Sequence, residues 1–168
     1  DPLFDYGYSS SPFDSEGTAS EKENLIENGT VKRFYFDLQT AGIVGALPTG
    51  NGYRSYSSQP SPGLTNIFVA PGDVSSDKMI ASMKDGIFVD QFIGMGQSNV
   101  LAGDFSASVA LGFKIEHGAI TGRIKDCMIA GNAFEIFADI AQISSDRIDS
   151  GSGALPYFLF NGVSLAAK

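Results

Sequence analysis

The sequence predicts an α+β fold dominated by β-structure, with antiparallel strands forming a sandwich or barrel-like sheet accompanied by two helices. Two observations lead to this fold class. Glycine supplies 20 of the 168 residues, an excess typical of turns, bulges and strand ends. Apolar stretches of strand length also alternate with Asn-Gly, Pro-Gly and His-Gly turn signals. We expect residues 1–168 to form a single domain, a fragment of a longer two-domain protein.

The first third of the chain combines loops with one hairpin. Residues 1–20 mix Pro, Gly, Ser and Asp with scattered aromatic side chains, which is typical of a surface loop. Asn28-Gly29 separates two apolar stretches and predicts a hairpin, with strands at about 23–27 and 30–37. Residues 40–62 return to a Gly-, Ser- and Pro-rich composition and are expected to form a long loop.

The middle of the chain predicts a strand, a helix and a second strand. Residues 64–70 are β-prone and end at Pro71-Gly72. Ser75 or Ser76 can cap a helix that Asp85-Gly86 terminates. A strand over GIFVDQFIG and a glycine-rich turn over MGQSNVLAGD follow.

A long hairpin and a second helix dominate the C-terminal part. Residues 105–116 and 119–129 alternate in polarity around a His117-Gly118 turn. Asn132 is placed to cap a helix over about 133–143, and a bent strand closes the chain after residue 154.

Charge and hydropathy exclude two classes of partner. The net charge of −8 argues against nucleic-acid binding, which needs clustered Lys and Arg. No apolar run reaches the ~18 residues of a membrane helix. The single cysteine allows no intrachain disulfide, which is compatible with a reducing cytoplasm.

The residues alone do not predict a catalytic centre. His117 is best interpreted as a turn residue before Gly118, and Cys127 as a small buried hydrophobic residue. One His and one Cys do not make a zinc site, and with the one His in a turn few bases are available to activate a nucleophile, so no catalytic triad is predicted. Gly94-Met95-Gly96 lacks the continuation of a phosphate-binding loop. These observations favour a binding or scaffolding domain without a cofactor or metal of its own.

Several stretches, in this order, resemble the C-terminal domain of the TldD/PmbA family. They are SPFDSEGTASEKENLIENGTVKRFYFDLQTAG, GLTNIFVAPGD, DGIFVDQFIGMG, LAGDFSASVALGFKIEHGAI and MIAGN. The most specific part combines GDFS at residues 103–106 with the IEHG that follows it. The family was once described as modulators of DNA gyrase and is now understood as components of metalloproteases.

The resemblance implies a choice between two subunits. In this family the TldD subunit holds zinc with an HExxxH helix and a late cysteine, whereas the PmbA (TldE) subunit lacks these ligands. The late cysteine corresponds to about residues 149–156 here, where Ser150 and Ser152 stand but no thiol. Serine does not replace a thiolate on zinc. The chain is therefore most similar to the non-catalytic PmbA/TldE subunit.

The resemblance also implies a function. We expect a cytoplasmic assembly that cleaves peptides, for instance during peptide maturation, with zinc in the partner subunit and none in this chain. The partner is a TldD-like chain or a second copy. Two alternatives stay open: the C-terminal half of a zinc peptidase whose HExxxH lies upstream, and an autonomous β-rich binding module. The candidate partner or peptide contacts are Gly94, Gly96, Gly103, Asp104, Phe105, Tyr53 and Tyr56.

Overall fold

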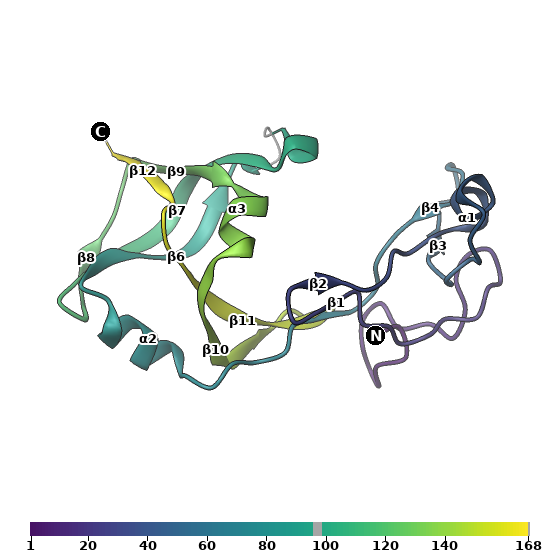
Figure 1. Ribbon diagram of the computed structural model, residues 1–168, viewed down its shortest axis with the longest axis horizontal. Helices are drawn as coiled ribbons and strands as arrows, with labels where there is room; N and C mark the ends of the chain where they lie inside the picture. The colour runs from purple at the N-terminus through teal and green to yellow at the C-terminus, as the bar shows by residue number, and fades with distance from the viewer. Residues whose placement is uncertain (96–98, 168) are drawn as a thin grey trace. The chain divides into compact units, whose positions relative to one another are not determined.

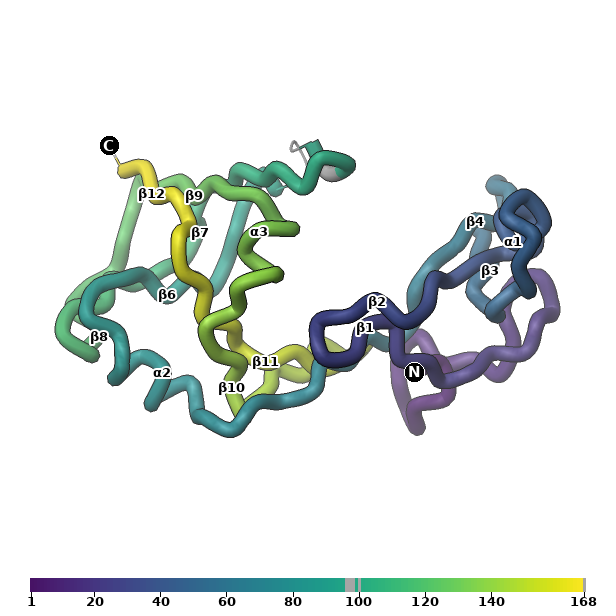
Figure 2. The backbone as a smooth tube through the Cα atoms, viewed as in Figure 1, coloured from purple at the N-terminus to yellow at the C-terminus, as the bar shows by residue number. Residues whose placement is uncertain are grey.

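The computed structural model describes residues 1–95 and 99–167, in two compact units (Figures 1 and 2). Unit 1 comprises Asp1–Ala70 and Ile148–Leu155, and unit 2 comprises Pro71–Arg147 and Pro156–Lys168. The chain is rich in strands that pair mainly antiparallel, with three short α-helices among the described residues. The predicted β-dominated α+β class is confirmed, but the sheets do not close into a barrel. No helix in the described part is long and apolar enough to span a bilayer.

Unit 1 consists mainly of loops joined by very short strands. The Asn28-Gly29 turn forms as predicted, with both residues at positive φ, but the strands on either side are only two residues long. The expected strands at 23–27 and 30–37 are therefore too long. The elements of this unit are β1 (Ile26–Glu27), β2 (Thr30–Val31), α1 (Leu38–Val44), β3 (Gly52–Tyr53), β4 (Ser61–Pro62) and β5 (Ile67–Phe68).

Helix α1 was not predicted, although its end signals are present in the sequence. The Asp37 carboxylate caps the helix by accepting a hydrogen bond from the Thr40 N–H at 2.6 Å. Gly45 ends it in the left-handed conformation, with φ 69°. The helix occupies the start of the segment that the composition assigned to a loop at 40–62.

Unit 2 is built on a five-stranded antiparallel sheet in the order β12-β9-β7-β6, with β8 also paired to β7. Strands β10 and β11 each contain residues of both units, and the residues of β11 that belong to unit 1, Gly153 and Ala154, pair parallel with β5 of the same unit. The elements are α2 (Ser76–Ser82), β6 (Asp85–Ile93), the 3₁₀ turn η2 (Val100–Ala102), β7 (Asp104–Glu116), β8 (Ala119–Arg123), β9 (Cys127–Asn132), α3 (Ala133–Ala138), β10 (Ile140–Asp149), β11 (Gly153–Phe160) and β12 (Ser164–Ala167).

The long hairpin has a different return strand from the one expected. The His117-Gly118 turn is confirmed, but the stretch 119–129 is broken in two. Asp126 takes φ 51°, which ends regular strand geometry between β8 and β9. As a result β8 pairs with the C-terminal part of β7, while β9 pairs with its N-terminal part, at 104–108.

The two helices of unit 2 were foreseen, but α3 is shorter than predicted. Helix α2 begins after Ser75, and α3 is capped by Asn132, as expected. The Ser75 side chain makes no capping hydrogen bond; the Ser76 N–H donates to the Asp146 carboxylate instead. Helix α2 ends at Ser82, and the predicted terminator Asp85-Gly86 is the start of β6. The predicted helix over 133–143 stops at Ala138 because Asp139 leaves helical geometry, with φ −128° and ψ 55°. Strand β10 then starts at Ile140.

The apolar core of unit 2 lies on one face of the paired strands β7 and β9. Cys127 and Ile129 of β9 pack against Ala107 and Val109 of β7, and all four side chains are buried. Partly buried neighbours surround this cluster: Ile87, Val89, Phe105, Ile124 and Val163. Because this core is small, hydrogen bonds in loops and at helix caps contribute a large share of the stability of the chain.

Candidate functional site

The seven predicted contact residues do not form one cluster within a unit. Tyr53 and Tyr56 belong to unit 1, whereas Gly94, Gly103, Asp104 and Phe105 belong to unit 2. Gly96 lies outside the described residues. Each group is therefore considered within its own unit.

Asn132 organises the start of strand β7. Its side-chain amide donates hydrogen bonds to the Ala102 carbonyl at 2.8 Å and to the Asp104 carboxylate at 3.0 Å. Its side-chain oxygen accepts from the first amides of α3. The Gly103 carbonyl accepts from the Ala133 N–H at 2.7 Å. Asp104 is thus committed to a structural hydrogen bond, and sequence reasoning had identified Asn132 only as a helix cap.

Gly103 needs both its conformation and its small size. It has φ 79°, and a Cβ at this position would lie 2.5 Å from the Phe134 ring. Gly94 also has positive φ, but a Cβ there would meet nothing within 4 Å. Phe105 is half-buried against the core, and its ring packs over Gly131, where an added Cβ would lie 3.1 Å from the ring. Gly103 and Phe105 therefore have structural roles that do not depend on a partner.

An exposed aromatic group beside these residues was not predicted. Helix α3 buries none of its side chains, and Phe134 and Phe137 remain 66% and 55% exposed. The Phe137 ring meets Phe160 edge-on at 5.2 Å, and Phe160 stacks on Phe158 at 5.7 Å. The sequence predicted one helix over about 133–143 here, and its pattern gave no signal that these aromatic side chains would be exposed.

In unit 1, Tyr53 lies beside a buried carboxylate. Asp14 accepts hydrogen bonds from the backbone N–H groups of Glu16, Thr18 and Gly52, at 2.8 to 2.9 Å. Burial raises the pKa of Tyr53, and the nearby Asp14 charge raises it further. The Tyr53 hydroxyl is buried near the Ser20 hydroxyl, whose interaction offsets part of the rise in the Tyr53 pKa. Asp14 holds together loop segments distant in sequence, a role that the sequence did not indicate.

Tyr56 is fully exposed, in contrast to Tyr53. It lies with Ser15, Arg54 and Ser55 around an open hollow of about 540 Å³. These side chains offer one guanidinium, hydroxyls and an aromatic ring to solvent. The hollow is an open surface feature of the loop.

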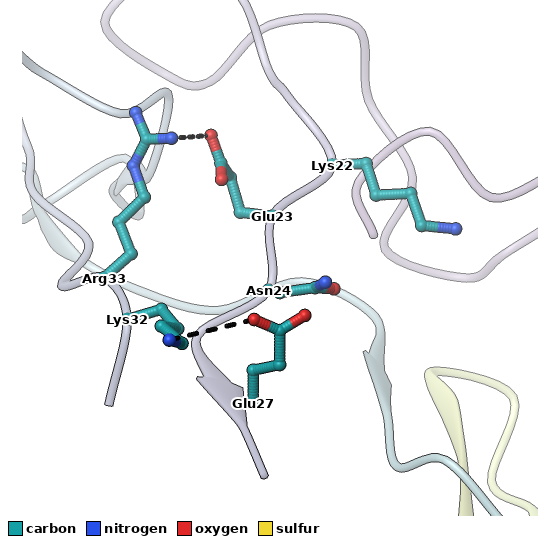
Figure 3. Close-up of a pocket in the computed structure, with 6 residues that line it drawn as sticks. All are labelled: Lys22, Glu23, Asn24, Glu27, Lys32 and Arg33. Carbon is teal, nitrogen blue, oxygen red and sulfur yellow. Dashed lines mark hydrogen bonds and ion pairs between the residues drawn. The ribbon is translucent and has the colours of Figure 1, made fainter. Parts of the chain in front are cut away.

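A second hollow, of about 530 Å³, lies at the β1–β2 hairpin (Figure 3). Its charged side chains are paired: Arg33 with Glu23, and Lys32 with Glu27 at 3.9 Å. The remaining cation, Lys22, pairs with a carboxylate outside the hollow. Since opposite charges are matched, the hollow does not select strongly for an ion of either sign.

His117 and Cys127 occupy the positions expected from the sequence. His117 is exposed in the turn with φ 52°, and its N–H donates to the Lys84 carbonyl at 2.6 Å. Cys127 is 4% exposed in the core, and burial raises the pKa of its thiol. Within residues 1–95 and 99–167, no three His, Cys, Asp or Glu side chains come close enough together to hold a metal ion.

The region where the resemblance places a late zinc ligand forms a tight turn in unit 1. Both the N–H and the hydroxyl of Ser150 donate to the Gly153 carbonyl, at 2.9 and 3.1 Å. Gly151 takes φ 75°. A Cβ on Gly153 would lie 1.8 Å from the Ile67 carbonyl oxygen, so β5 approaches this turn very closely. Ser150 therefore stabilises the turn with its hydroxyl.

Comparison with known proteins gives consistent matches along the chain. The model of the PmbA/TldA metallopeptidase C-terminal domain matches residues 1–167. A metalloprotease TldD homolog of Buchnera aphidicola is 36% identical over 142 residues, which cover 83% of this chain and 29% of that protein. The chain therefore spans less than a third of that relative's length.

Two solved structures share the fold. TldE from Thermococcus kodakarensis superposes with a TM-score of 0.87 at 29% identity, covering 99% of this chain and 38% of that one. A putative modulator of a DNA gyrase from Thermotoga maritima gives a TM-score of 0.86 at 30% identity, with the same coverage. The family match extends over nearly the whole sequence and agrees with the GDFS and IEHG motifs. This chain belongs to the TldD/PmbA metallopeptidase family and corresponds to its C-terminal domain.

Proposed function

We propose that this chain is the C-terminal domain of a PmbA/TldE-like subunit in a TldD/TldE-type metalloprotease complex, where it supplies binding surface rather than catalytic groups. The observation that carries the proposal is the turn at 149–156. The family resemblance places a cysteine ligand of the catalytic subunit there, and this chain has serine residues. The Ser150 hydroxyl is already bound to the Gly153 carbonyl, and a neutral hydroxyl is a poor substitute for a thiolate on zinc.

The one cysteine of the chain does not compensate for this difference. Cys127 lies in β9 and packs in the core with Ala107 and Ile129. A thiol whose pKa is raised by burial is less readily deprotonated, and zinc binds the thiolate. Moving this side chain out to a metal would open a cavity in the core beside Ala107 and Ile129. Its burial supports a structural role for Cys127.

Zinc bound in a partner subunit would supply an activated water for peptide hydrolysis. The residues of this chain would then position the peptide and the partner through Tyr53, Tyr56 and the segment around Gly94 and Gly103. Apolar contact suits a chain of net charge −8, because two acidic surfaces repel each other. Phe134 and Phe137 on α3 supply exposed apolar area for such contact. We therefore expect association that salt weakens only slightly.

A second candidate function is the C-terminal half of a zinc peptidase that carries HExxxH upstream of residue 1. The 36% identity to a protein named as a TldD homolog favours this alternative. Both candidates place the activity in proteolysis, for instance peptide maturation in the cytoplasm. They differ in whether the zinc ligands belong to the same polypeptide. The third alternative, an autonomous binding module, has no support from the comparisons.

Full-length protein, expressed with and without a TldD-like chain from the same genome, tests the proposal. We expect co-purification in a stable ratio, zinc only in the partner, and peptide hydrolysis that disappears when the partner's HExxxH is mutated. The Cys127→Ala variant is the matched control and should retain hydrolysis. Hydrolysis with the partner absent, or one tightly bound zinc per copy of the isolated subunit, would contradict the non-catalytic assignment. A stable homodimer active alone would favour the second candidate.

A further inference from the structure

The chain contains three Asn-Gly dipeptides in different surroundings. Glycine has no Cβ, so its backbone nitrogen can approach the side-chain amide carbon of a preceding asparagine with little hindrance. Asparagine is accordingly one of the thermolabile residues of proteins. Asn28-Gly29 and Asn161-Gly162 are exposed, whereas Gly52 is buried behind half-buried Asn51. The three sites thus share one sequence and differ in structure.

Asn28 and Gly29 are free of the contacts that would hold their reactive groups apart. Both residues are exposed, with φ 50° and 74°. A Cβ at Gly29 would meet nothing within 4 Å. Neither the Asn28 side chain nor the Gly29 N–H makes a hydrogen bond within the described residues. Because β1 and β2 share only two residue pairs, the turn can rearrange with the loss of few hydrogen bonds.

Asn51 and Gly52 show the opposite arrangement. The Asn51 amide nitrogen donates to the Gly63 carbonyl at 2.9 Å, and its oxygen accepts from the Thr49 hydroxyl at 2.8 Å. The Gly52 N–H donates to the buried Asp14 carboxylate at 2.8 Å. Attack by the Gly52 nitrogen on the Asn51 side chain would break all three hydrogen bonds. The fold therefore protects this dipeptide.

We propose that Asn28 is a site of spontaneous deamidation and isomerisation in the native protein. The deprotonated Gly29 backbone nitrogen attacks Cγ of Asn28, a new N–Cγ bond forms, and the Cγ–Nδ2 bond breaks. The side-chain nitrogen takes up a proton and leaves as ammonia, which produces a cyclic succinimide. Water then opens the ring at either carbonyl and yields aspartate or isoaspartate. No oxidant or reductant takes part.

The product would alter the hairpin at which the charged hollow lies (Figure 3). Isoaspartate adds one atom to the backbone, so the turn no longer matches the pairing of Ile26 with Val31. Either product adds a negative charge next to Glu27, which pairs with Lys32 at 3.9 Å. The modification would thus loosen β1–β2 and make this surface more acidic.

Incubation of the folded chain at mildly alkaline pH, followed by peptide mapping with mass spectrometry, tests the proposal. We expect aspartate and isoaspartate at Asn28 to accumulate at least about tenfold faster than at Asn51, a barrier difference of about 1.4 kcal/mol. Exposed Asn161 is the internal positive control and should also react. In urea, where the fold no longer protects Asn51, all three sites should react at similar rates.

The variant Asn28→Gly can keep the positive φ of the turn but lacks the reactive side-chain amide. It should therefore release less ammonia than the parent chain, by the amount that Asn28 contributes. Modification of Asn161 without modification of Asn28 would overturn the proposal, as would equal rates at Asn28 and Asn51 in the folded protein. Because each site is read separately, partial unfolding of the hairpin in a variant does not obscure the result in the parent chain.

Discussion

Replacing Gly103 by alanine should destabilise the domain by an amount that the local geometry sets. An L-residue in the left-handed region costs about 1–2 kcal/mol relative to glycine, and Gly103 has φ 79°. The added Cβ would also lie 2.5 Å from the Phe134 ring. That ring is 66% exposed, so it can rotate away into solvent. The backbone conformation therefore accounts for most of the loss.

We expect a loss of about 1–2 kcal/mol for Gly103→Ala and roughly 1–3 kcal/mol for Gly103→Val, the range for strain at a special backbone position. Urea unfolding of the chain measures it. With an m value of about 2 kcal/mol/M, the alanine variant should unfold at a midpoint lower by about 0.5–1 M. The two glycines that serve as controls are Gly94 and Gly122.

Gly94→Ala isolates the cost of the backbone conformation, because φ is 88° and a Cβ would have no neighbour within 4 Å. Gly122→Ala should carry neither the backbone cost nor the steric cost, because this strand position has no positive φ and a Cβ there would meet nothing within 4 Å. The order of midpoints should be Gly122→Ala, then Gly94→Ala, then Gly103→Ala as the least stable. If Gly103→Ala unfolds together with Gly122→Ala, the reasoning about the start of β7 is wrong.

Three further substitutions or conditions test other parts of the structure. Asp14→Ala leaves three loop N–H groups without their acceptor and should cost roughly 3 kcal/mol in urea unfolding, with a smaller loss for Asp14→Asn. Cys127 should resist alkylation in the folded chain and react in urea, because burial raises its pKa; rapid labelling of the native thiol would contradict its place in the core. The pKa values of Asp37 and Asp146 are lowered by hydrogen bonds from Thr40 and Ser76. Their stabilisation is therefore present above about pH 4 and lost as pH falls through the lower folded-state values, so Asp37→Asn should reduce the acid sensitivity of the urea midpoint.

Local turn chemistry was the part of the fold that the sequence predicted best. The turns at Asn28-Gly29 and His117-Gly118 and the cap at Asn132 form as expected, and α2 begins after Ser75, although the Ser75 side chain makes no capping hydrogen bond. Each depends on residues within a few positions of one another, so a short window contains the whole signal. Helix α1 follows the same rule. Its end signals, Asp37 and Gly45, were present in the sequence, but the polar composition around them led to the prediction of a loop.

Long-range pairing was harder to predict. The stretch 119–129 has the polarity of one continuous strand, yet Asp126 breaks it so that β9 can pair with the N-terminal part of β7. This break allows Cys127 and Ile129 to be buried against Ala107, a contact between residues about twenty positions apart. The free energy of that burial cannot be inferred from a short stretch of sequence. The same limit applies to the candidate contacts, since composition cannot tell which compact unit a loop joins.

The polar side chains that first suggested chemistry are largely committed to structure. Asp14 binds three loop amides, Asp104 binds the Asn132 amide, and Ser150 closes a turn. Asp14 is the buried member of this group, so releasing it would leave loop N–H donors unpaired, and it is a poor candidate for proton transfer or metal binding. Under the proposed function, the domain would offer a partner or peptide mainly backbone and apolar surface. Recognition of that kind depends on shape more than on particular side chains.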